Sequence, residues 1–203
     1  MPGLLRPAGS NTDRNWRMRS CLPGPARVSI TRSGGLVTRM RLYVGGEWGE
    51  AGSDVVDLGE VAAPLAARAL LEVAERERRA DKAIFAAIIA DSVEVWPQLL
   101  AIAKNGDLVK DTRKSAVFWL SQAAGDAATK GLSELAEAEQ DREIRDQAVF
   151  ALSQLPSEQG VPVLIRLAKT NRDPEVRRKA IFWLGQSDDP RVLALFEELL
   201  TRR

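Results

Sequence analysis

The feature that most constrains the fold is an internal repeat with a period of 32 residues. Three eleven-residue segments align without gaps: 112–122 (TRKSAVFWLSQ), 144–154 (IRDQAVFALSQ) and 176–186 (VRRKAIFWLGQ). A weaker copy lies at 81–87. Apolar residues recur at helical spacing in every copy, so each segment predicts an amphipathic helix.

A second apolar helical pattern recurs at an offset of 16 residues from each copy, as at 98–103 and 163–168. Two amphipathic helices in each period of about 32 residues indicate an α-solenoid, in which stacked neighbours supply the core. First helices are predicted near 63–75, 93–104, 126–137, 158–169 and 190–201. Second helices are predicted near 78–90, 110–122, 142–154 and 174–186, with Asp141 and Asp173 as N-caps. The expected fold is an all-α superhelix of about four and a half repeats.

The first quarter of the chain has a different pattern. Residues 1–25 are rich in proline and glycine and are expected to form a disordered basic leader. Residues 26–32 and 36–44 alternate around Ser33-Gly34-Gly35, which predicts a β-hairpin. Residues 54–57 offer a third short strand. The expected domains are therefore the leader, a hairpin cap at 26–57 and the repeat array at 58–203, with the hairpin covering the first repeat.

Composition restricts the chemistry. The 203 residues include no histidine and a single cysteine, Cys21. Catalysis that uses histidine as the proton carrier is excluded, as are zinc or iron sites built on histidine. We expect no catalytic residue, no metal site and no cofactor. Carboxylate pairs are chemically available, but Asp188-Asp189 and Glu197-Glu198 fit helix capping and solvated surface. The expectation is that the protein is not an enzyme.

Charge is divided unevenly along the chain. Residues 1–53 contain eight arginines and three acids, for a net charge of +5, whereas residues 54–203 carry −4. A mildly acidic array argues against binding a phosphate backbone, so no nucleic-acid partner is expected. The basic leader either contacts nucleic acid or an acidic partner, or is simply a solvated segment. No run of apolar residues is long enough to span a membrane, and the start lacks an intact secretory signal. The expected location is therefore cytoplasmic, or periplasmic if the true N-terminus with a signal is missing.

One surface of the second helices is expected to carry a row of phenylalanines. With the central alanine of each copy at 0° and about 100° per residue, the phenylalanines fall near 200°, away from the buried arc. Aligned exposed aromatic residues often mark an interface, but phenylalanine is usually buried, so packing of the row between repeats stays open as the alternative. The candidate partner-binding residues are Phe85, Phe118, Phe150, Phe182, Gln122, Gln154, Gln186, Lys114, Asp146 and Arg178.

Two other recurring residue types, arginine and tryptophan, are expected to stabilise the fold rather than to bind a partner. Arg113, Arg145 and Arg177 fall at about 60°, inside the buried arc, where a guanidinium can bond acids or carbonyls of the adjacent repeat. Trp119 and Trp183 fall at about 300° and are expected to lie in the core.

The run at 173–185, with Asp173, Pro174, Val176, Arg177 and Ala180, followed by Leu184 and Gly185, resembles HEAT repeats. The closest likeness is to the HEAT-like repeats named after phycobilisome lyases, over residues 58–203. The resemblance implies that the second helices line the concave side of the array. It implies a non-catalytic scaffold that binds another protein there. An accessory subunit of a bilin-lyase-type complex is the alternative, and binding of DNA lesions is a third. A hydroxylase branch of the family needs histidine ligands and is excluded.

Overall fold

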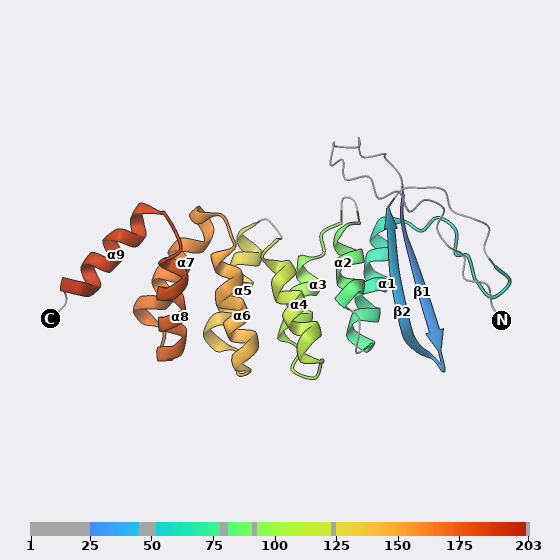
Figure 1. The fold of residues 1–203 in the computed structure, drawn as a ribbon, viewed down its shortest axis with the longest axis horizontal. Coiled ribbons are helices and arrows are strands. Elements are labelled where there is room, and N and C mark those ends of the chain that lie inside the picture. The colour runs from blue at the N-terminus through green and yellow to red at the C-terminus, as the bar shows by residue number, and fades with distance from the viewer. Residues whose placement is uncertain (1–24, 45–51, 78–80, 91–92, 123–124, 202–203) are drawn as a thin grey trace, which may run out of the picture.

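The computed structural model describes residues 25–44, 52–77, 81–90, 93–122 and 125–201. Within these ranges the chain forms one antiparallel hairpin followed by nine helices (Figure 1). The strands are β1 (Ala26–Ser33) and β2 (Leu36–Val44). The helices are α1 (Ala63–Arg76), α2 (Asp81–Ile88), α3 (Trp96–Lys104), α4 (Lys110–Leu120), α5 (Asp126–Ala138), α6 (Arg142–Ser153), α7 (Ser157–Thr170), α8 (Pro174–Leu184) and α9 (Pro190–Thr201).

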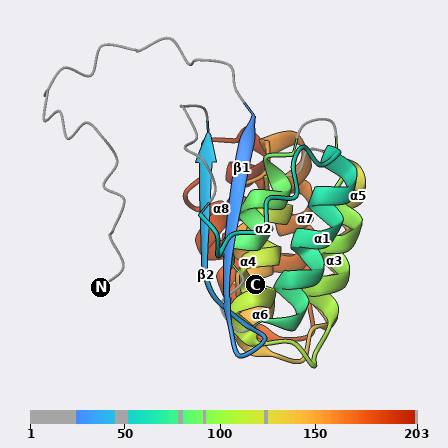
Figure 2. The same cartoon turned by 90° about the vertical axis from the view of Figure 1, so that its right-hand side faces the viewer.

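The helices stack in two layers along one axis. Odd-numbered helices form one layer and even-numbered helices form the other, as the end-on view in Figure 2 shows. Neighbouring even-numbered helices approach one another more closely than neighbouring odd-numbered helices do. The even-numbered layer is therefore the inner, shorter side of the superhelix. The predicted all-α solenoid with a β-hairpin at its front is confirmed.

Helix ends follow the signals in the sequence. Asp141 Oδ1 accepts the backbone N–H of Glu143 at 2.8 Å, and Asp173 Oδ1 accepts that of Glu175 at 2.8 Å, as expected of N-caps. Helix α3 begins three residues later than predicted, at Trp96, because Pro97 fits the first turn of a helix but not its interior.

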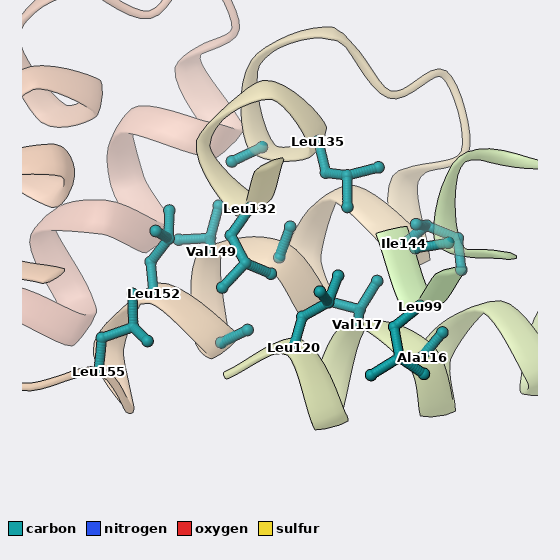
Figure 3. Packing of buried hydrophobic residues seen from close by; sticks show 14 of the residues in the cluster. Leu99, Ala116, Val117, Leu120, Leu132, Leu135, Ile144, Val149, Leu152 and Leu155 are labelled. Carbon is teal, nitrogen blue, oxygen red and sulfur yellow. The ribbon is translucent and has the colours of Figure 1, made fainter. Parts of the chain in front are cut away.

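The core runs without interruption from one repeat to the next. In Figure 3, side chains from four successive helices meet between the layers. Leu99 of α3, Leu120 of α4, Leu132 of α5 and Leu152 of α6 are all fully buried. Since each two-helix unit exposes apolar faces on both sides, every interior repeat is stabilised by its two neighbours.

The hairpin covers the first repeat. Gly34 (φ 59°) and Gly35 (φ 82°) occupy the left-handed region, which a two-residue turn of type I′ requires. Met40 of β2 is buried in the same core cluster as α1 and α2, with Val28 and Leu42 packed against it. The expected capping role of the hairpin is therefore seen in its packing.

The expected third strand at 54–57 is wrong. The backbone N–H of Val55 bonds to Gly52 in a turn, and Asp57 Oδ1 accepts the backbone N–H of Gly59, which has a φ of 67°. Val56 is 84% exposed. The alternating valines thus lie in a turn-bounded loop, with no strand beside them in the described part of the chain. The expected leader at 1–25 falls almost entirely outside the described residues.

The recurring arginines join the layers, as predicted. Arg113 is 5% exposed; its Nε donates to the carbonyl of Ala103 at 2.9 Å, and its Nη2 pairs with Glu139 at 2.6 Å. Arg145 likewise bonds the carbonyl of Glu139 and pairs with Asp173. The carbonyl belongs to the end of the first helix in the arginine's own repeat, and the acid to the next repeat. Each such arginine clamp therefore ties one repeat to its successor.

Candidate protein-binding surface

The phenylalanine row lies on the even-numbered (inner) layer, on the face that points away from the odd-numbered helices. Phe85 on α2, Phe118 on α4 and Phe182 on α8 are 41%, 39% and 57% exposed, while Phe150 on α6 is half-buried. The row is therefore not enclosed between repeats. Its helices present it outward because each phenylalanine lies opposite the buried alanine of its copy, such as Ala116.

Two tryptophans belong to the same surface. Trp119 lies between Phe85 and Phe118, with ring centroids 5.4 and 5.0 Å away. Trp183 lies in the same way between Phe150 and Phe182, at 4.9 and 5.0 Å. We call these six rings the aromatic strip.

The assignment of the tryptophans to the core was only half right. Both are half-buried and packed against the core, yet each also joins two phenylalanines of neighbouring helices. The corresponding position in α6 is Ala151, which is buried. The strip therefore consists of two three-ring groups rather than one continuous ladder. A helical wheel of one helix cannot show this, because the contacts of Trp119 with Phe85 and of Trp183 with Phe150 cross between helices.

A row of glutamines runs beside the rings at the carboxyl ends of the same helices. Gln122, Gln154 and Gln186 are exposed. Gln122 Nε2 donates to Ser121 Oγ at 3.1 Å, and that hydroxyl donates to the carbonyl of Phe118 at 2.6 Å. The arrangement repeats at Gln154, Ser153 and Phe150. The first two amides are thus held next to the rings, whereas Gln186 follows Gly185 and has no serine before it.

The three charged candidates lie on the same surface but are engaged within the array. Lys114 pairs with Glu143 at 3.4 Å, Asp146 with Lys179, and Arg178 with Glu175. They belong to a band of ion pairs near the amino ends of the even-numbered helices. Arg142 extends this band from α6 to Glu175 of α8.

The band is electrostatically balanced. Lys110 contacts both Glu143 and Asp141, at 2.8 and 3.1 Å. Its hydrogen bond lowers the pKa of Glu143, and the same bond raises the pKa of Lys110. Burial opposes ionisation of Asp141, but hydrogen bonds from Lys110 and the backbone outweigh it and lower that pKa. Opposite charges therefore neutralise one another beside an aromatic strip that is itself uncharged.

The strip continues onto the hairpin. A hollow of about 480 Å³ beside Phe85 is lined by Met40, Arg41, Leu42, Tyr43, Lys82 and Phe85. Sequence reasoning missed the β2 residues, because it treated the hairpin only as a cap. The signal was present: Arg41 and Tyr43 alternate with the inward-facing Met40 and Leu42.

A second hollow lies on the outer layer, between α5 and α7. It is about 490 Å³ and is polar, with Ser133, Glu137 and Arg166 among its lining residues. Arg166 bonds Ser133 at 2.6 Å and pairs with Glu137 at 2.9 Å, so these groups already bind one another.

The described ranges hold no cluster of three or more metal-ligating side chains. Their helices include none with the length and apolar character needed to cross a bilayer.

Comparison with known proteins gives a family match for the second part of the array. Residues 129–203 match the family model described as HEAT repeats. No curated protein and no solved structure is significantly similar to the chain. The match does not name the narrower phycobilisome-lyase group. It begins within α5 and continues through α9, and the upstream helices continue the same two-layer stack (Figure 1).

Proposed function

We propose that the protein is a non-catalytic scaffold that binds another protein along the aromatic strip, a proposal supported by the match of residues 129–203 to HEAT repeats. HEAT repeats commonly mediate protein–protein interaction. The strip lies on the inner layer, where a stacked array offers a partner one extended, continuous surface.

The observation that carries the proposal is the exposure of three phenylalanines on one face. Phe85, Phe118 and Phe182 keep between 39% and 57% of their surface accessible, and their neighbours in the strip are also rings. Aromatic residues are enriched in the buried centres of interfaces and dominate their binding energy. Phe–Trp contacts also hold the rings in fixed positions, which reduces the entropy lost when a partner orders them.

The surroundings of the strip support binding rather than catalysis. The strip contains aromatic rings and is flanked by glutamines, none of which serves as a general acid or base. Glu143, Asp146 and Glu175, three carboxylates of the band, are engaged by lysine and arginine side chains. The ion pairs surround an apolar centre with a polar rim, which is the usual anatomy of a protein interface.

The test is a selection of random peptides displayed on phage against the immobilised full chain. Each enriched peptide is then measured against three proteins by fluorescence anisotropy. These are the wild type, the double variant Phe118→Ser/Phe182→Ser, and the control Leu65→Ser, which removes a 61% exposed leucine from α1 in the outer layer. Circular dichroism verifies that all three are folded.

Enriched peptides are expected to bind the wild type and the control equally, and to bind the double variant at least about tenfold more weakly. A selection that yields no peptide distinguishing the double variant from the control would overturn the proposal.

A further inference from the structure

The spacing of the strip specifies the kind of segment that fits it. The ring-to-ring steps of 5.4 and 5.0 Å place Phe85 and Phe118 at most about 10 Å apart, close to the 8–10 Å at which helices usually pack. The steps of 4.9 and 5.0 Å give the same limit for Phe150 and Phe182. Within each three-ring group, two phenylalanines on neighbouring even-numbered helices are therefore no more than about 10 Å apart, and packed helices set their spacing at about 8–10 Å.

Polyproline II matches this interval best among extended conformations. It returns a side chain to the same side every three residues, after about 9.3 Å. A β-strand does so every two residues, after about 6.7 Å, and falls out of step with the rings at the second repeat. An α-helix brings a side chain back to the same side after seven residues, or about 10.5 Å, which is slightly longer than the usual spacing of packed helices.

The glutamines distinguish polyproline II from a helix. Gln122 and Gln154 each use one N–H to bond a serine, which leaves the second N–H to donate. The carbonyls of polyproline II are free of internal hydrogen bonds and can accept from such a row, whereas those of a helix are bonded internally. Proline rings also pack well on aromatic side chains, and their stiffness lowers the entropy lost on binding.

The hollow at the hairpin end adds a charge preference. Arg41 and Lys82 line it beside Phe85, and both are exposed. No carboxylate pairs with Lys82 among the residues that the structure describes. A carboxylate at one end of the bound segment therefore complements this end of the strip, whereas the ion pairs beside the rest of the strip are already neutralised.

From spacing, hydrogen-bonding capacity and charge together, we infer that the partner presents a proline-rich segment in polyproline II conformation, with prolines every third residue and an acidic residue at one end. The segment crosses α2 to α8, so it is about ten residues long. This inference rests on the proposed binding function and specifies the partner for the same surface.

The probe is a fluorescently labelled synthetic peptide of about twelve residues, with proline at every third position and aspartate at one end. Its matched control has the same composition, with the prolines moved out of the three-residue spacing. Anisotropy measures the affinity of the full chain for both peptides. The spaced peptide is expected to bind at least about tenfold more tightly, a ratio equivalent to about 1.4 kcal/mol.

Variants of the rings, of the glutamines and of Lys82 test where the spaced peptide binds. Phe118→Ser/Phe182→Ser and Gln122→Ala/Gln154→Ala are each expected to weaken the spaced peptide, while Leu65→Ser leaves it unchanged. Lys82→Ala is expected to reduce the preference for the aspartate end and to flatten its dependence on salt. Equal affinity for the spaced and rearranged peptides, or the same affinity in the glutamine variant as in the wild type, would overturn the inference.

The selection described above separates the two proposals. If enriched peptides require the strip but lack prolines at three-residue spacing, the protein is a scaffold for another kind of segment, and only this inference fails. If no peptide requires the strip, both fail.

Discussion

The inner and outer layers of the array differ in what lies between neighbouring helices. In the inner layer, aromatic rings of neighbouring helices meet, and Lys110 of one repeat reaches Glu143 of the next. In the outer layer, ion pairs such as Lys104–Glu134 also link neighbouring helices, but α5 approaches α3 through Gly131, where an added Cβ would meet Leu100 at 2.8 Å. The inner layer thus exposes the phenylalanines and glutamines that recur with the period. The exposed aromatic and amide side chains that repeat along the array are therefore concentrated on one side of the fold.

The largest effect is expected where the two layers are joined. Arg113→Ala removes a buried guanidinium from the carbonyl of Ala103 and from Glu139, whose side chain is only 12% exposed. Leaving a carboxylate almost buried without its partner is expected to lower the free energy of unfolding by about 3 kcal/mol. Urea denaturation measures the loss.

The matched control is Arg177→Ala. Arg177 donates only to the carbonyls of Asn171 and Arg172 among the contacts within the described residues, so its loss is expected to be about 1 kcal/mol. Equal losses in the two variants would show that the ion pair to the next repeat adds nothing to the clamp.

Two glycines test how rigidly the outer layer is packed. In Gly160→Ala, the new Cβ would lie 2.2 Å from the carbonyl oxygen of Leu152, a backbone atom that cannot move without shifting the end of α6. We expect a net loss of about 2 kcal/mol, because overpacking outweighs the helix propensity gained. Thermal unfolding followed by circular dichroism checks it.

Gly131→Ala is the paired variant. Its Cβ would meet the methyl groups of Leu100, which is only half-buried and can change rotamer. The expected change is within about 0.5 kcal/mol of zero, since the gain in helix propensity offsets the strain. If Gly131→Ala were as damaging as Gly160→Ala, the helices of the outer layer would be fixed by their own contacts rather than by the junction with the inner layer.

Most of the difference between the two layers could be predicted from the sequence, because the repeat period of a solenoid determines which residues lie on the same face of successive helices. The offset of 32 residues aligned Arg113 with Arg145 and placed Phe118 outward, since position on one helix follows from periodicity alone. The pairing of Arg113 with Glu139 could not be predicted, because it depends on how one repeat is rotated against the next. The contact of Trp119 with Phe85 was missed for the same reason.

The phenylalanines should be among the least costly apolar residues to replace. Phe182→Ser removes a side chain that is 57% exposed, and the expected loss is within about 0.5 kcal/mol. Phe150→Ser is expected to cost more, about 1 to 2 kcal/mol, because Phe150 is half-buried against Trp183. Urea denaturation of both variants checks the order, and a larger loss for Phe182→Ser would contradict the exposures.

The smallest effect is expected in the band of ion pairs. Because the pKa of Glu143 is lowered in the folded state, its contribution to stability is present above its ordinary value of 4.5 and is lost as the pH falls through the lowered value. Lys110→Met removes the largest cause of the shift and leaves the longer contact with Lys114. Stability curves of the wild type and the variant, measured from pH 7 to pH 2, are expected to converge at the acid end.

Addition of salt is the control for this last comparison. About 1 M sodium chloride is expected to reduce the difference between the wild type and Lys110→Met at pH 7, since these exposed charges are screened. A difference that persists unchanged in salt and in acid would show that Lys110 acts through its packed hydrocarbon chain rather than through its charge.

The arginine clamp also bears on how such a gene can change. Arg113 reaches back to the end of α3 and forward to Glu139, and Arg145 repeats both contacts one period later. A tandem duplication of one whole period would therefore carry its own donor and its own acceptor, and each would meet a matching group at the new boundary. An insertion of any other length would separate them. Growth and loss in units of 32 residues are thus the length changes that this architecture tolerates without further mutation.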